Sequence, residues 1–123
     1  DLASLLRNGV DIWLTVDGPR GPRGVVKQGA VELGRLTSSA IIPITNTARK
    51  RRLLESWDRF QIPAPFTKVI VEYGEPVILP DRADPAMIEC ERLRVEERLA
   101  AMTAALDREI GHAGSEVWPH EDR

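Results

Sequence analysis

The sequence has little that would cross-link the chain, bind a metal through sulfur or span a membrane. A single cysteine, Cys90, excludes an internal disulfide and a cysteine-based zinc site. No run approaches the roughly 18 consecutive apolar residues that a membrane-spanning helix needs. The net charge of -2 disfavours a general nucleic-acid-binding protein. A G-x-x-x-x-G-K-[ST] loop and a dinucleotide-binding fingerprint are both absent, which disfavours a nucleotide or phosphosugar enzyme.

The composition that is present is that of an ordinary globular protein, with 42% hydrophobic and 29% charged residues. A chain of 123 residues is long enough to bury a core. Residues 1–80 hold 11 basic and 8 acidic residues, whereas residues 81–123 hold 6 and 11. This charge split, together with the dense prolines and glycines of the first part, predicts a site-bearing region over 1–80 and a helical appendix over 81–123. The chain opens at Asp1 without a methionine or a targeting pattern, so we expect it to be a piece of a longer protein.

Apolar patterning predicts an α/β fold. Short apolar runs are typical of strands, here at 12–16, 41–45 and 68–73, and helical spacing predicts helices over 1–8 and 27–38. The order strand, loop, helix, strand is the βαβ signature, which favours a partial parallel or mixed sheet with flanking helices.

A long amphipathic helix is predicted at the C-terminal end of the chain. Asp84 is a suitable N-cap, and Pro85 follows it at the first helical position. One apolar stripe then continues for about 25 residues at helical spacing, through Ile88, Val95, Leu99, Met102, Leu106 and Ile110. We interpret this stripe as a packing surface against the sheet or another chain.

The loop over residues 17–24 is the segment richest in candidate site residues. It follows a predicted buried strand, and open α/β sheets bind their ligands at that end of a strand. Its glycines allow close backbone approach, and Arg20 and Arg23 carry planar forks suited to phosphate or carboxylate. Lys27 and the free N–H groups of the next helix add affinity for anions. These residues predict a cradle for an anionic group; the alternative is a tight loop whose arginines are solvated.

Four segments of the sequence resemble bacterial lysophospholipid acyltransferases. Residues 13–34 read W-L-T-V-D-G-P-R-G-P-R-G-V-V-K-Q-G-A-V-E-L-G, which is similar to the third conserved block of that family. The match is closest to a subgroup with the block T-P-D-G-P-R-G-P, long labelled a domain of unknown function. Residues 42–44 (I-P-I), 56–66 (S-W-D-R-F followed by I-P-A-P-F) and 71–76 (V-E-Y-G-E-P) resemble later segments of the same subgroup. The resemblance covers about residues 5–80.

The resemblance implies the C-terminal part of an acyltransferase domain with a glycerolipid-acyltransferase-like fold. Such an enzyme transfers an acyl chain from an acyl thioester, carried by coenzyme A or by acyl carrier protein, to the hydroxyl of a phosphate-bearing lipid. It implies no bound cofactor and a peripheral position at the cytoplasmic face of the inner membrane. We also expect no metal, and the net charge of -2 leads us to expect no nucleic-acid partner. The family's general base is a histidine in an H-x-x-x-x-D block. His112 and His120 lack that spacing, so we expect no catalytic residue in this chain and no activity of the chain alone.

The resemblance also assigns residues within the loop. Asp17, Gly18, Arg20 and Arg23 stand at the positions that hold the acceptor phosphate. Related acyltransferases have Glu-Gly-Thr-Arg there, and Pro19 replaces the threonine in this chain, which puts the threonine's contacts in doubt.

A basic and aromatic stretch over 49–60 gives no clear secondary structure. Arg49, Arg51 and Trp57 are candidates for contact with a lipid headgroup or a membrane interface. A solvated basic turn is the alternative for the arginines, and a place in the core is the alternative for the tryptophan. For the whole chain, the alternative to an acyltransferase is a non-catalytic anion-binding or interaction module. An H-x-x-x-x-D block before Asp1 would favour the enzyme.

Overall fold

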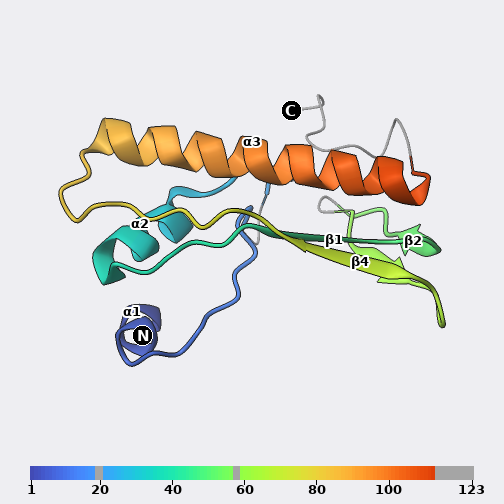
Figure 1. The fold of residues 1–123 in the computed structure, drawn as a ribbon, viewed down its shortest axis with the longest axis horizontal. Helices are drawn as coiled ribbons and strands as arrows, with labels where there is room; N and C mark the ends of the chain where they lie inside the picture. The colour runs from blue at the N-terminus through green and yellow to red at the C-terminus, as the bar shows by residue number, and fades with distance from the viewer. Residues whose placement is uncertain (19–20, 57–58, 113–123) are drawn as a thin grey trace.

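A computed structural model of the chain describes residues 1–18, 21–56 and 59–112, and over these residues the fold is mixed α/β. A long C-terminal helix lies along small antiparallel strand pairs (Figure 1). The elements in chain order are α1 (Leu2–Arg7), α2 (Gln28–Thr37), β1 (Ile44–Ala48), β2 (Arg51–Leu53), β3 (Gln61–Pro63), β4 (Val69–Tyr73) and α3 (Pro85–Ile110).

The structure confirms the long helix and both of its ends. The Asp84 side chain accepts a hydrogen bond from the backbone N–H of Met87 at 2.8 Å, and Pro85 opens α3. The helix ends at Gly111, whose φ of 97° is in the left-handed region that glycine adopts without strain. The predicted stripe is the buried face, because Ile88, Val95, Leu99 and Leu106 are all buried.

Strands β1 and β4 pair antiparallel beneath α3. The register runs from Ile44 opposite Tyr73 to Ala48 opposite Val69. Directly paired residues point to the same face of a sheet, and alternate residues point to opposite faces. Thr45 contacts Thr103 of α3 through a 2.7 Å hydroxyl–hydroxyl bond, so this face of β1 is the one that α3 covers.

The prediction of a parallel or mixed sheet is wrong for the described residues, where both two-stranded pairs are antiparallel. The reason is the connection between β1 and β4. The chain leaves β1, forms the β2/β3 hairpin and returns, so that it runs back along β1 in the opposite direction. A parallel pair requires a crossover connection, and no such connection joins these two strands.

The predicted strand over 12–16 is also wrong. This segment forms no strand, and Trp13 is 74% exposed. A continuous apolar run predicts burial on both faces, but no strand in the described part of the chain pairs with it. One residue of the run, Val16, packs against the buried cluster of Val26, Val95 and Leu99. The predicted strand over 41–45 is displaced: β1 begins at Ile44, and Ile41 forms an isolated bridge with Val77.

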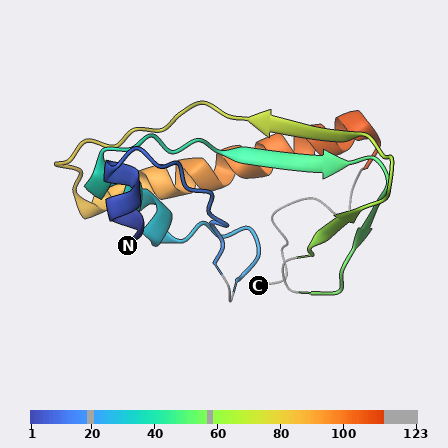
Figure 2. The same cartoon turned by 90° about the horizontal axis from the view of Figure 1, so that it is seen from below.

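The stretch that gave no prediction contains a short hairpin. Strand β2 pairs antiparallel with β3, with Arg51 opposite Pro63 and Leu53 opposite Gln61. Figure 2 shows this hairpin and the loop before α2 extending to the same side of the layer that α3 forms with β1 and β4. Across the described ranges, the helices are too short or too polar to cross a bilayer.

Candidate functional site

The loop over 17–24 takes a conformation that depends on glycine. Gly18, Gly21 and Gly24 have φ values of 72°, 63° and 84°, all in the left-handed region. Gly21 and Gly24 are buried, which brings the loop backbone close to its neighbours. Side chains other than glycine adopt these angles at a cost of about 1 kcal/mol or more. These three positions of the loop therefore require glycine.

Helix α3 fixes the position of this loop. The backbone N–H of Val26 donates to the Glu96 carboxylate at 3.0 Å, and the Val26 carbonyl accepts from Arg92 at 2.9 Å. The backbone N–H of Lys27 donates to the Val16 carbonyl at 2.7 Å, which closes the loop at its base. The two Val26 bonds join the end of the loop to Arg92 and Glu96 of α3, which are largely buried and paired with each other at 3.5 Å. The loop is therefore anchored to a rigid element at its base.

Arg23 lies in a concentration of positive charge. Burial lowers the pKa of its guanidinium, and the nearby charges of Arg59 and then Arg51 lower it further. The carboxylates of Asp17 and Asp107 act in the opposite direction and raise it. Two further arginines and two carboxylates thus act on Arg23, and we call Arg23, Arg51 and Arg59 the arginine cluster. Such an arrangement favours an added anion.

A buried polar network fixes the position of the Arg51 side chain. Its Nη1 donates to Asp107 Oδ1 at 3.2 Å and to Gln61 Oε1 at 2.9 Å. The two charged side chains are only 8% and 3% exposed. Thr47 donates to the same carboxylate oxygen at 2.7 Å. The network therefore fixes one member of the arginine cluster to α3 and to the strands β1 and β3.

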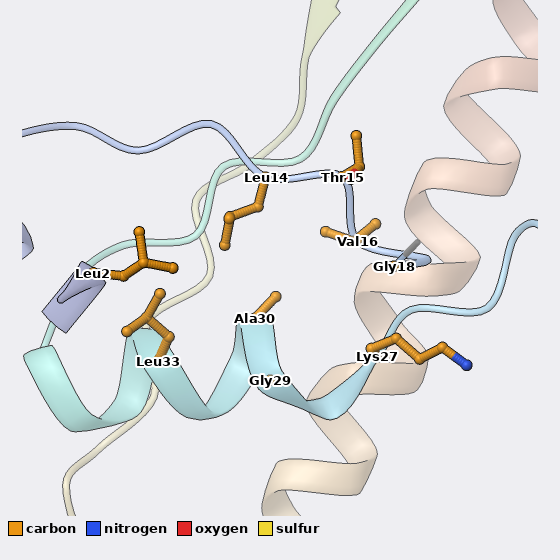
Figure 3. A pocket seen from close by; sticks show the side chains of 9 residues that line it. All are labelled: Leu2, Leu14, Thr15, Val16, Gly18, Lys27, Gly29, Ala30 and Leu33. Carbon is orange, nitrogen blue, oxygen red and sulfur yellow. The ribbon is translucent and has the colours of Figure 1, made fainter. Parts of the chain in front are cut away.

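A mostly apolar pocket of about 340 Å³ borders the same loop. Figure 3 shows Leu2, Leu14 and Leu33 pointing toward one another, with Gly18 and Lys27 at the other end. The first turn of α2 forms part of the wall. The complete lining is Leu2, Leu14, Thr15, Val16, Gly18, Lys27, Gly29, Ala30 and Leu33.

Most of the predicted loop residues border these two features. Asp17 and Arg23 belong to the charged side, whereas Gly18 and Lys27 line the pocket. Arg20, the other predicted loop arginine, lies outside the described residues.

The three candidate residues of the basic stretch, Arg49, Arg51 and Trp57, differ in what the structure shows of them. Arg51 points inward to Asp107 and Gln61 and is neither a solvated turn residue nor freely available to a headgroup. Arg49 is exposed where β1 ends, and Trp57 lies outside the described residues.

Two residues of the site were missed by sequence reasoning. Asp107 lies four residues after Thr103 and eight after Leu99, so it is on the face of α3 that packs against the strands. This spacing places an acidic residue on a buried helix face, and it could have identified Asp107 as a buried charge from the sequence. Arg59 has a φ of 49°, and no sequence signal places it beside Arg23.

The described residues offer no cluster of three or more His, Cys, Asp or Glu side chains that would hold a metal ion. His112 follows α3, and its Nε2 lies 2.8 Å from the carbonyl oxygen of Ala48. A carbonyl oxygen only accepts, so this nitrogen is the donor and the imidazole joins the end of α3 to β1. His120 lies outside the described residues.

Comparison with known proteins gives one informative match. Over 103 residues, or 84% of its length, the chain is 32% identical to an uncharacterized protein of Rickettsia prowazekii (strain Madrid E). The matched region is 45% of that protein, so the chain spans about half the length of the curated relative that it matches. No protein-family model and no solved structure matches the chain.

Proposed function

We propose that this chain is the acceptor-binding part of a lysophospholipid-type acyltransferase. In this proposal the full-length protein has a glycerolipid-acyltransferase-like fold and moves an acyl chain from an acyl thioester to the hydroxyl of a phosphate-bearing lipid. The observation that carries the proposal is the position of one glycine-rich loop, which contributes Arg23 to the arginine cluster and Gly18 to the lining of a mostly apolar pocket. A ligand that satisfies both features is an anionic amphiphile.

The charged side of the loop suits a phosphate. Burial and two neighbouring cations destabilise the charged form of Arg23, and a phosphate dianion would offset both effects. Arginine forks also match phosphate oxygens with two parallel hydrogen bonds. Arg51 contributes to this assignment through its charge at a fixed position, because its Nη1 is bound to Asp107 and Gln61.

The apolar side of the loop suits an acyl chain. The pocket volume of about 340 Å³ is at the lower end of typical ligand pockets. Each methylene group removed from water there contributes about 0.8 kcal/mol. A few carbons of one acyl chain, seated between Leu14 and Leu33, would therefore contribute as much as the headgroup contacts.

The reaction itself requires a base that we place outside this chain. The acceptor hydroxyl loses its proton to the base and attacks the thioester carbonyl. The new C–O bond forms, the C–S bond breaks, and the thiolate leaves and takes up a proton. In this proposal the chain binds and orients the acceptor, and the rest of the longer protein supplies the H-x-x-x-x-D histidine.

Acceptor kinetics of the full-length protein test the proposal. The assay follows ester formation from an acyl thioester and 1-acylglycerol-3-phosphate, with each substrate varied in turn. Loss of a hydrogen bond to a charged group costs about 1.5–3 kcal/mol, so Arg23→Ala raises the acceptor KM roughly 10- to 100-fold and leaves the donor KM unchanged. Arg82→Ala, at an exposed arginine just before α3, is the matched control. An unchanged acceptor KM in Arg23→Ala removes the phosphate role.

The second candidate is an anion-binding module without turnover. The observation that favours it is the position of His112, whose Nε2 is held by the Ala48 carbonyl and which is the one histidine among the described residues. Binding of the acceptor by the full-length protein, with no ester formed from any acyl thioester offered, would decide for this candidate.

A further inference from the structure

We propose that the β2/β3 hairpin is a docking element for an anionic lipid bilayer. The proposal rests on the face of the hairpin that points away from the buried network, and it does not depend on acyl transfer. The register places Arg52 opposite Ile62, and the adjacent pairs on the same face are Lys50 with Ala64 and Leu54 with Phe60. The other face carries Arg51 and Gln61, which bond inward. We call Lys50, Arg52, Phe60 and Ile62 the outer hairpin face.

The outer hairpin face exposes apolar side chains that a soluble surface would normally bury. Phe60 and Ile62 are 59% and 45% exposed. Phe66, at the corner where the chain turns back toward β4, is fully exposed and has a φ of 57°. Isolated apolar residues are common on protein surfaces, but Phe60 and Ile62 are neighbours on one face of the hairpin, and Phe66 lies in the segment that joins β3 to β4. Aromatic side chains of this kind are enriched where a protein meets the headgroup region of a bilayer.

Cations accompany these apolar side chains. Lys50 and Arg52 belong to the same face, and Arg49 and Lys68 flank it where β1 and β4 meet the hairpin. Residues 49–68 contain six basic and two acidic residues, in a protein whose overall net charge is -2. Four of these basic residues are exposed and lie outside the arginine cluster, namely Arg49, Lys50, Arg52 and Lys68, and their charge is complementary to the anionic lipids of a membrane surface.

The shape of the element favours a bilayer over other anionic partners. Strands β2 and β3 extend away from the layer of α3, β1 and β4 (Figure 2), and Arg52, Phe60 and Ile62 on the outer hairpin face are exposed. Single-stranded nucleic acid binds in basic grooves where successive bases stack on aromatic side chains, whereas the outer hairpin face as defined has one aromatic side chain, Phe60, beside the aliphatic Ile62. Apolar groups that enter a headgroup layer, with cations beside them, are the features of interfacial membrane binding.

Photocrosslinking of the full-length protein tests this surface directly. Benzoylphenylalanine replaces Phe66 in one variant and Tyr73, an exposed aromatic of β4, in a matched control. Each variant is irradiated with vesicles of phosphatidylglycerol and phosphatidylcholine, and the adducts are identified by mass spectrometry. The proposal expects lipid adducts at 66 and few or none at 73. Equal yields at the two positions, or no lipid adduct at 66, overturn it; an adduct at 66 to nucleic acid or protein from an added cell extract, obtained in place of lipid, decides for that partner.

Charge variants test the electrostatic part of the proposal with the same crosslinking readout. Each cation near an anionic bilayer changes binding by about fivefold, so Lys50→Gln and Arg52→Gln together reduce the yield of lipid adduct at 66 by about 25-fold at limiting vesicle concentration. Arg82→Gln, at an exposed arginine outside the hairpin, leaves the yield unchanged. Vesicles of phosphatidylcholine alone give the low yield with every variant. A yield that is insensitive to both hairpin substitutions contradicts the docking surface.

Discussion

Removal of Asp107 tests the buried network that holds the site together. The Asp107 carboxylate accepts from Thr47 at 2.7 Å and pairs with Arg51 at 3.2 Å, and both charged side chains are almost fully buried. Asp107→Ala takes away the balancing charge and leaves the guanidinium in a poorly solvated place. Breaking a buried ion pair by removing one partner costs about 3–5 kcal/mol. That is a large fraction of the 5–15 kcal/mol by which a domain is typically stable.

Denaturant unfolding of the full-length protein, followed by circular dichroism, measures this cost. We expect Asp107→Ala to lower the free energy of unfolding by about 3 kcal/mol, which corresponds to a fall in Tm of roughly 10 °C. Glu97→Ala, at an exposed position of the same helix, is the control and changes stability by less than about 0.5 kcal/mol. The paired change Arg51→Met with Asp107→Leu recovers most of the loss, because apolar side chains of similar volume replace such pairs at little net cost.

A stability of Asp107→Ala equal to that of the control would refute the reasoning. So would a paired variant whose loss equals the sum of the two single losses, because the two charges would then not act as a unit.

Two further predictions concern positions around the loop. A Cβ at Gly34 would lie 2.8 Å from the Ile41 side chain, whereas one at Gly29 would meet nothing within 4 Å; Gly34→Ala therefore destabilises the protein by about 1–3 kcal/mol and Gly29→Ala does not, as thermal melts of the two variants will show. The carboxylate of Glu96 accepts from the backbone N–H of Val26 at 3.0 Å, so Glu96→Ala speeds hydrogen exchange of that amide at least tenfold, and unchanged protection at Val26 would contradict the anchoring of the loop.

The local features of the fold could be predicted from the sequence. Asp84 and Pro85 mark the start of α3, its apolar stripe gives the buried face, and both depend on residues a few positions apart. The strand over 69–73 was likewise predicted, because its apolar run ends at Gly74. These signals depend on residues that are close in the sequence, and the tertiary contacts of this fold are consistent with them.

The partners of the strands could not be predicted in the same way. The run over 12–16 has the composition of a buried strand, but composition does not supply a neighbour, and Trp13 is exposed in the structure. The direction of pairing between β1 and β4 depends on the hairpin that separates them. That hairpin lies in the stretch whose mixture of basic and aromatic residues has no clear period.

The candidate site was predicted in part. The loop could be identified as a candidate site because its glycines allow close backbone approach and its Arg23 carries a cation suited to phosphate. The four consecutive basic residues over 49–52 look equivalent in the sequence, and strand alternation turns Arg51 inward and Arg52 outward only once β2 has formed. Arg59 and Asp107 join the site through tertiary packing, which no local pattern records.

The most direct test of the account is equilibrium binding of a phosphate-bearing lipid to the loop. Calorimetry with the full-length protein compares 1-acylglycerol-3-phosphate with the monoacylglycerol of the same chain length, both below their critical micelle concentrations. The account predicts that the phosphate lipid binds more tightly, and that Arg23→Ala weakens its binding about tenfold or more while binding of the uncharged lipid is unchanged. Equal affinities for the two lipids, or an Arg23→Ala variant that binds the phosphate lipid like the wild-type protein, would contradict the anionic site.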